Sequence, residues 1–244
     1  MQPSTFRFGA GLLAACLVTW TATLAVPAAA PTSPTSPTSP TSPTSPTAPQ
    51  ALDPRAEAVL HTLEKSFAGI TSVQTDFTEE KELAVFDKKI VLQGSMALAG
   101  VDRLAWHVTS PVRYSLVITG TTLRQWDEDS GKVQEISLAG NPVFNVVIDQ
   151  VRNWFSGRYL SLIREYNVNV TSEKPLVLEF VPRPAAMPAK VIARVTVALR
   201  EDQRYVQEIR IEEKSGDKTR MRFSNTVLNE PVRAAVWEVK PGAK

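Results

Sequence analysis

The chain has 244 residues, with 27 lysines and arginines against 25 aspartates and glutamates, so its formal net charge is only +2. So weak a positive field does not gather phosphates, and it argues against nucleic acid as a partner. The single cysteine, Cys16, lies in an N-terminal apolar run, which excludes disulfides, iron–sulfur clusters and thiolate zinc sites from the rest of the chain.

The first residues are typical of a secretory signal. One charge, Arg7, precedes a long uncharged stretch, and small residues then offer a cleavage site after Ala28. We therefore expect residues 1–28 to be removed and the protein to be exported to the periplasm. Two alternatives stay open: an acylated Cys16, in a segment similar to a lipobox, would tether the protein, or the uncharged stretch would remain as an uncleaved anchor.

Residues 29–52 form a predicted linker. Pro-Thr-Ser is repeated five times from Pro31, and such a sequence has no apolar side chains with which to bury a core. Proline at every third position favours an extended spacer of about 3.1 Å per residue. The remaining residues, 53–244, are of a size that usually makes one domain.

The domain opens with a predicted helix. Asp53 followed by Pro54 has the pattern of an N-cap and a first helical residue. The apolar residues that follow share one helical face as far as Gly69: Val59, Leu60, Leu63 and Phe67.

From Ile70 the apolar period changes to two, which predicts antiparallel strands up to Asn141. Gly120 and the turn at 129–131 separate short strands of this meander. Further strands are predicted at Tyr166–Val170, Leu176–Val181, Val191–Leu199, Tyr205–Ile211, Thr219–Ser224 and Ala234–Val239.

A second helix is predicted after Asn141-Pro142, because apolar residues recur there at three- and four-residue steps until Gly157. About ten to eleven strands with so few helices must curl or leave a face uncovered. We therefore expect an α+β fold: a strongly curved antiparallel sheet whose concave face is covered by helices.

Several segments, taken in order, resemble the LolA family of periplasmic outer-membrane lipoprotein carriers. The segment 70–79 is similar to the family's strand motif S-(hydrophobic)-x-A-x-F-x-Q, and 94–111 is similar to its pair of strands with a tryptophan and a proline. The segment 118–127 resembles the family's D-G-x-x-(hydrophobic)-W hairpin, and 222–239 resembles its closing segment and last strand. The resemblance covers nearly all of residues 53 to 240.

The resemblance implies an unclosed half β-barrel that holds acyl chains of a lipoprotein, or of another lipid, in an apolar cavity. It implies a monomeric carrier that receives cargo from an inner-membrane donor transporter and delivers it to an outer-membrane acceptor. A lipid-sensing regulatory module and a carrier for a non-lipoprotein lipid, such as an aryl-polyene-type product, remain alternatives. We expect the cavity to be walled by strand residues and plugged by the second helix: the wall residues are Leu104, Trp106, Val108, Leu116 and Ile118, and the plug residues are Phe144, Ile148, Val151 and Phe155.

One departure from the family pattern concerns the lid. Members that load lipoproteins usually carry an arginine before the tryptophan strand that latches the helical lid, and Gly100 stands near that position here. Arg103 is close in sequence, but a shift of one residue in a strand inverts the face to which a side chain points. We therefore expect Arg103 to lie on a different face from the latch.

The sequence favours binding over catalysis. It contains no GxSxG elbow and no P-loop, and neither His61 nor His107 begins a metal-ligand spacing. Both histidines are predicted to be structural, and the alternating charges of 208–220 are predicted to form a solvated hairpin with cross-strand pairs. We expect neither enzymatic activity nor a metal or cofactor.

Overall fold

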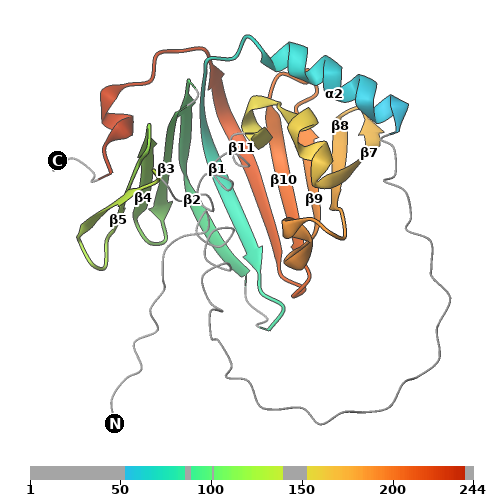
Figure 1. Cartoon of the computed structure of the whole chain (residues 1–244). Helices are drawn as coiled ribbons and strands as arrows, with labels where there is room; N and C mark the ends of the chain where they lie inside the picture. The colour runs from blue at the N-terminus through green and yellow to red at the C-terminus, as the bar shows by residue number, and fades with distance from the viewer. Residues whose placement is uncertain (1–52, 86–88, 101, 140–152, 240–244) are drawn as a thin grey trace, which may run out of the picture.

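The computed structural model describes residues 53–85, 89–100, 102–139 and 153–239. In this part of the chain, eleven strands form one antiparallel sheet in the order β6-β5-β4-β3-β2-β1-β11-β10-β9-β8-β7 (Figure 1). The first and last strands of the chain, β1 and β11, pair in the middle, and β6 and β7 are the two edges. The expected open, curved sheet with few helices is therefore confirmed.

The elements follow the chain in a nearly continuous meander. The first helix of the described residues is α2, Pro54–Phe67. The strands are β1 Ser72–Glu82, β2 Lys89–Ala99, β3 Arg103–Ser110, β4 Tyr114–Thr119, β5 Thr122–Asp127, β6 Val133–Ser137, β7 Tyr166–Glu173, β8 Leu176–Pro182, β9 Ile192–Leu199, β10 Val206–Glu213 and β11 Lys218–Leu228. The described residues also form the 3-10 helices η1 Tyr159–Arg164, η2 Met187–Lys190 and η3 Ala234–Trp237.

The first helix begins where the sequence predicts. The Asp53 carboxylate accepts a hydrogen bond from the backbone N–H of Arg55 at 2.9 Å, and Pro54 occupies the first turn. Its inward face packs on η1 and β7, across one end of the sheet (Figure 1). The residues buried on that face are Ala56, Leu60, Leu63 and Phe67.

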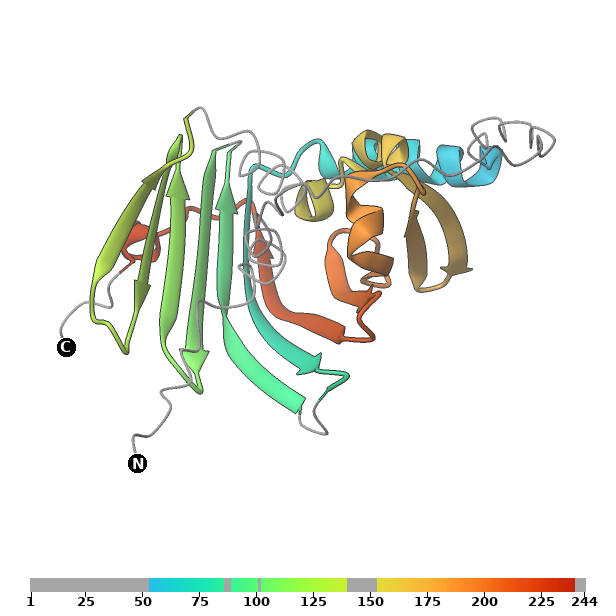
Figure 2. The same cartoon turned by 60° about the horizontal axis from the view of Figure 1, so that its bottom comes forward.

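The sheet bends strongly, and α2 and η1 lie on its concave side near β7 to β11 (Figure 2). The larger hydrophobic cluster joins these helices to the concave face of the strands. A second, smaller cluster lies on the opposite, convex face and is built mainly from small residues of β2, β3 and β4 under the C-terminal segment. Because both faces of β4 are covered, residues 114–118 of this strand are all buried.

The C-terminal segment corrects one expectation. The predicted strand Ala234–Val239 is instead the 3-10 helix η3 followed by an extended residue. The neighbouring strand β11 is already paired on both sides, with β1 and with β10, and offers this segment no free edge. The segment buries its apolar residues on the convex face, where Trp237 and Val239 belong to one cluster with Ala105.

The described residues contain no helix that is both long and apolar enough to cross a membrane. The predicted signal at 1–28, the linker at 29–52 and most of the second predicted helix lie outside the described residues. Of that second helix the structure describes the end, where residues 153–156 are helical and Gly157 follows in a turn.

Candidate functional site

The strand residues predicted to wall a cavity lie together on the concave face. Leu104 and Trp106 of β3 are directly opposite Ile118 and Leu116 of β4, and all four are at most 3% exposed. Val108 continues the same face of β3 and belongs to the same hydrophobic cluster. The structure therefore gathers these residues into one continuous apolar surface, and their contact with a lipid stays a prediction.

The centre of this surface is an aromatic stack that bridges three strands. The ring of Phe77 on β1 lies over the indole of Trp106 on β3, with centroids 4.1 Å apart and planes inclined by 27°. Gly94 of β2 lies directly opposite Phe77 in the register, and a Cβ there would come within 2.6 Å of the Phe77 ring. Glycine is thus required at this position for the ring to cross β2 and reach the indole.

The predicted plug is described only at its end. Phe155 is buried and packs edge-on against Phe223 of β11, with centroids 5.0 Å apart. Phe144, Ile148 and Val151 lie outside the described residues.

A second aromatic group fills the hollow at β7 and β8. The Trp154 ring packs edge-on against Phe180 at 4.7 Å and lies 6.0 Å from Tyr166. The Tyr159 hydroxyl donates to the Trp154 carbonyl at 3.0 Å, and complete burial raises the pKa of this phenol. Trp154 lies in the second predicted helix, whose apolar pattern does not indicate these partners, because they come from η1, β7 and β8.

Polar residues continue the concave face toward the far end of β1, and sequence reasoning missed them. Beyond Phe77, the inward positions of β1 are Glu79 and Lys81, which are 0% and 7% exposed. The Lys81 ammonium lies 3.6 Å from the Glu213 carboxylate of β10. The two-residue period of the strand could have indicated them, because Glu79 and Lys81 have the same parity as Val73 and Phe77.

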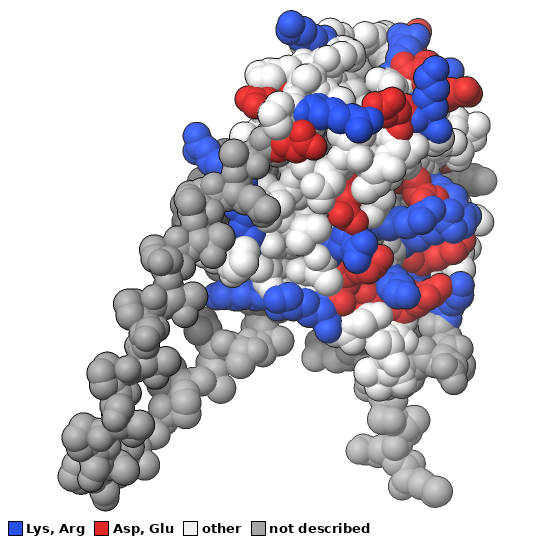
Figure 3. Space-filling view, turned by 90° about the vertical axis from the view of Figure 1, so that its right-hand side faces the viewer, with Lys and Arg blue, Asp and Glu red and all other residues white. Residues whose placement is uncertain are grey.

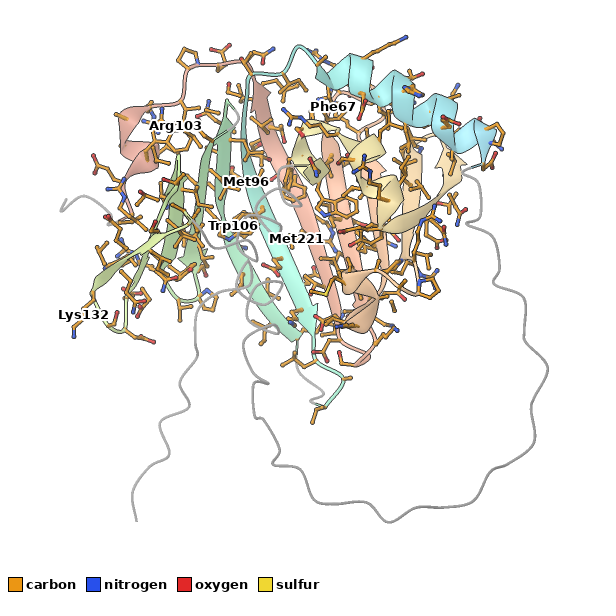
Figure 4. The ribbon with its side chains drawn as sticks, in the orientation of Figure 1. Phe67, Met96, Arg103, Trp106, Lys132 and Met221 are labelled. Carbon is orange, nitrogen blue, oxygen red and sulfur yellow. The ribbon has the colours of Figure 1, made fainter. Side chains whose placement is uncertain are left out.

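The Glu79 carboxyl is an unusual feature of this wall. Its direct neighbours across the sheet are Leu92 of β2 and Met221 of β11, which flank it with apolar side chains. Within the described part of the chain, neither of its oxygens has a hydrogen-bond partner. Burial raises the pKa of Glu79 to about 7, and the charge of Lys81 only partly opposes this effect. Figure 4 shows Met221 with Met96 and Trp106 over the central strands of the curved sheet.

Arg103 lies on the convex face, away from the concave cluster. Its guanidinium packs over the Trp237 ring, 4.0 Å from the centroid, while the neighbouring Leu104 points to the opposite side. Arg103 therefore faces away from the surface formed by Leu104 and Trp106. His107 has the same parity and is a structural residue: its ring nitrogens lie 2.9 Å from the Ser115 hydroxyl and 2.8 Å from the Val236 carbonyl.

The charged hairpin of β10 and β11 forms the predicted cross-strand pairs. Glu208 of β10 lies 2.7 Å from Arg220 and 3.5 Å from Arg222, both on β11. Charges of both signs alternate over the side of the molecule seen in Figure 3, with no large field of one sign. A shallow hollow of about 250 Å³ beside this hairpin is lined by such paired charges, including Glu82 and Lys89. Among the described residues, no group of three or more His, Cys, Asp or Glu is placed to hold a metal.

Comparison with protein families gives one match. The family model described as outer membrane lipoprotein carrier protein LolA matches residues 68–240. No curated protein matches the chain.

Solved structures give distant likenesses. A LolA superfamily protein from Nitrosomonas europaea is 12% identical, with a TM-score of 0.39 over 72% of this chain and 94% of that one. Lipoprotein LppX from Mycobacterium tuberculosis is 12% identical, with a TM-score of 0.42 over 74% of this chain and 98% of that one. MucB in its complex with MucA, from Pseudomonas aeruginosa, is 12% identical, with a TM-score of 0.43 over 75% of this chain and 60% of that one. Likenesses this weak carry no inference about what this chain binds.

Proposed function

Because the chain belongs to the LolA family of outer membrane lipoprotein carrier proteins, we propose that it is an exported carrier that binds the acyl chains of a lipoprotein, or of another lipid. The observation that carries the proposal is the apolar concave face built by Trp106 and its cross-strand neighbours. Water will not carry a lipid chain, since each buried methylene is worth about 0.8 kcal/mol. A chain with about fifteen methylenes therefore gains on the order of 12 kcal/mol on entering a dry cavity.

A carrier must also release its cargo. We propose that the second predicted helix, with Phe144, Ile148, Val151 and Phe155, occupies the cavity when cargo is absent and competes with it. Such competition lowers the net affinity, because cargo must displace apolar contacts that the empty protein already makes. The packing of Phe155 on Phe223 supports this role, since it ties the end of the helix to the centre of the sheet.

The route follows from the predicted signal. We propose that residues 1–28 direct export, and that the periplasmic monomer takes cargo from an inner-membrane transporter to an outer-membrane acceptor. N-terminal sequencing of the protein from its own envelope should then begin near Ala29. A mature form that begins at an acylated Cys16 would show a tethered protein, and the diffusing carrier would be the wrong description.

The test of binding uses delipidated, folded protein and a fluorescent lipopeptide. We expect saturable binding at micromolar concentrations, and its absence would refute the carrier. Phe155→Ala is expected to bind more tightly and release more slowly, because it weakens the proposed plug. Val227→Ala is a control on β11. Because the Val227 side chain is exposed, this substitution should leave the affinity and the release rate unchanged.

A further inference from the structure

The inward face of β1 carries, between Phe77 and Lys81, a carboxyl that has no visible structural use. Glu79 is fully buried, both of its oxygens lack hydrogen-bond partners within the described residues, and Leu92 and Met221 flank it. Buried polar groups in folded proteins are nearly always hydrogen-bonded, and each exception calls for a reason. A group that costs stability and holds nothing together is expected where a ligand supplies the missing partner.

The place of Glu79 in the sheet indicates where that ligand would lie. Phe77, which stacks on Trp106, is the preceding inward residue of β1, so the carboxyl adjoins the apolar surface proposed to take acyl chains. Lys81 follows on the same face, but its ammonium is already paired with Glu213 at 3.6 Å. Along β1 the inward side chains are therefore an aromatic ring at Phe77, an unpaired hydrogen-bond acceptor at Glu79 and an ion-paired ammonium at Lys81.

We propose that Glu79 is a cargo-binding residue, and that its carboxyl accepts hydrogen bonds from an amide N–H or hydroxyl group attached beside the acyl chain of the lipid. The inference rests on the proposed carrier function and narrows its cargo class. An apolar wall alone accepts any hydrocarbon chain, whereas a buried acceptor favours lipids that bring a donor to it. A lipid without a donor leaves Glu79 unpaired, and a fatty-acid carboxylate places a second negative charge beside it.

The raised pKa of Glu79 agrees with this assignment. Burial raises this pKa and the charge of Lys81 opposes the shift, in line with the absence of hydrogen-bond donors to either oxygen among the described residues. Hydrogen bonds donated to a carboxylate are among the stronger ones, so a donor-bearing lipid would gain most at this position.

The experiment compares two lipids that share a palmitoyl chain, measured by displacement of a fluorescent acyl probe from the exported protein at about pH 8, above the raised pKa. N-palmitoylethanolamine brings an amide N–H and a hydroxyl, and methyl palmitate brings no donor. The wild type should prefer N-palmitoylethanolamine by about ten- to a hundredfold, the range of one hydrogen bond to a charged group.

Substitutions then assign the preference to one side chain. Glu79→Met keeps the volume and removes the acceptor, so the two lipids should bind within about twofold of each other. Glu79→Gln keeps a weaker, neutral acceptor and should give an intermediate preference. If Glu79→Met does not fold, the preference of Glu79→Gln is the test. Glu80→Gln is the matched control on the same strand, because Glu80 lies on the convex face beside Arg222, 3.2 Å away, and should keep the wild-type preference.

The outcomes separate this inference from the function on which it rests. Equal binding of the two lipids by the wild type, or an unchanged preference in both Glu79 variants, overturns the role of Glu79 and leaves the carrier intact. If neither lipid nor the fluorescent probe binds saturably, the carrier proposal fails and this inference fails with it.

Discussion

Phe77 and Trp106 stack across an intervening strand, with ring centroids 4.1 Å apart. The arrangement depends on Gly94 of β2, which leaves room for the Phe77 ring to pass over the sheet. Two strands on either side of β2 are thereby joined through side chains as well as through backbone hydrogen bonds. The stack also sets the centre of the surface that we propose takes the lipid.

A double-mutant cycle should measure this stack. Phe77→Leu and Trp106→Leu each keep an apolar residue and remove one ring, so each should lower the free energy of unfolding by about 1–3 kcal/mol. Their coupling should be about 0.5–1.5 kcal/mol, the value of an aromatic pair beyond its buried area. Urea unfolding of the four proteins gives both numbers, and strictly additive effects would show that the rings do not interact.

The turn after the second helix gives another prediction. Gly157 has φ +72°, and a Cβ there would lie 2.5 Å from Cγ of Phe67 in α2. Gly157→Ala should therefore destabilise the protein by about 1–3 kcal/mol, through a left-handed backbone and through the displaced ring. Gly69→Ala is the control, because no atom lies within 4 Å of its Cβ position and its φ is not positive. Equal midpoints of thermal unfolding for the two variants would contradict the packing.

The convex face should affect stability without affecting cargo. Trp237→Leu removes the ring that packs under the Arg103 guanidinium and should lower the free energy of unfolding by about 1–3 kcal/mol. The affinity for a fluorescent lipopeptide should stay unchanged, because Trp237 belongs to the cluster on the face opposite Trp106. A change in affinity at unchanged stability would mean that the two faces are coupled.

The sequence predicted those parts of the fold that depend on local signals. The cap at Asp53 and the period of β1 follow from short-range chemistry, and both agree with the structure. The segment Ala234–Val239 was predicted to be a strand, but it contains η3 and packs on the convex face through Trp237 and Val239. Strand order is a non-local property that a single periodic pattern does not contain.

The same limit applies to the candidate site. The period identified Leu104, Trp106 and Ile118 as one face, and the structure places them together. The inward position of Glu79 followed from the same period, but a charged residue near a strand end is usually solvated, and its burial depends on neighbours from β2 and β11. The contact of Phe155 with Phe223 joins residues distant in sequence and could not be derived from either segment alone.

The last prediction concerns the pH dependence of stability. Glu79 has its pKa raised from 4.5 to about 7 in the folded protein, so between these values the folded state keeps a proton that the unfolded chain has lost. The free energy of unfolding contributed by this group therefore falls as pH rises from about 4.5 to about 7, by about 3 kcal/mol in all, and stays low above that range.

Glu79→Gln removes this titration while keeping the size and polarity of the side chain. Relative to the wild type, it should be nearly neutral at about pH 4 and more stable by up to about 3 kcal/mol at about pH 8, as measured by urea unfolding at a series of pH values. Glu80→Gln, on the convex face beside Arg222, should show no such rise with pH. If the Glu79 variant gains nothing at the higher pH, the carboxyl has a partner in solution, and the unfilled acceptor on which the cargo assignment depends does not exist.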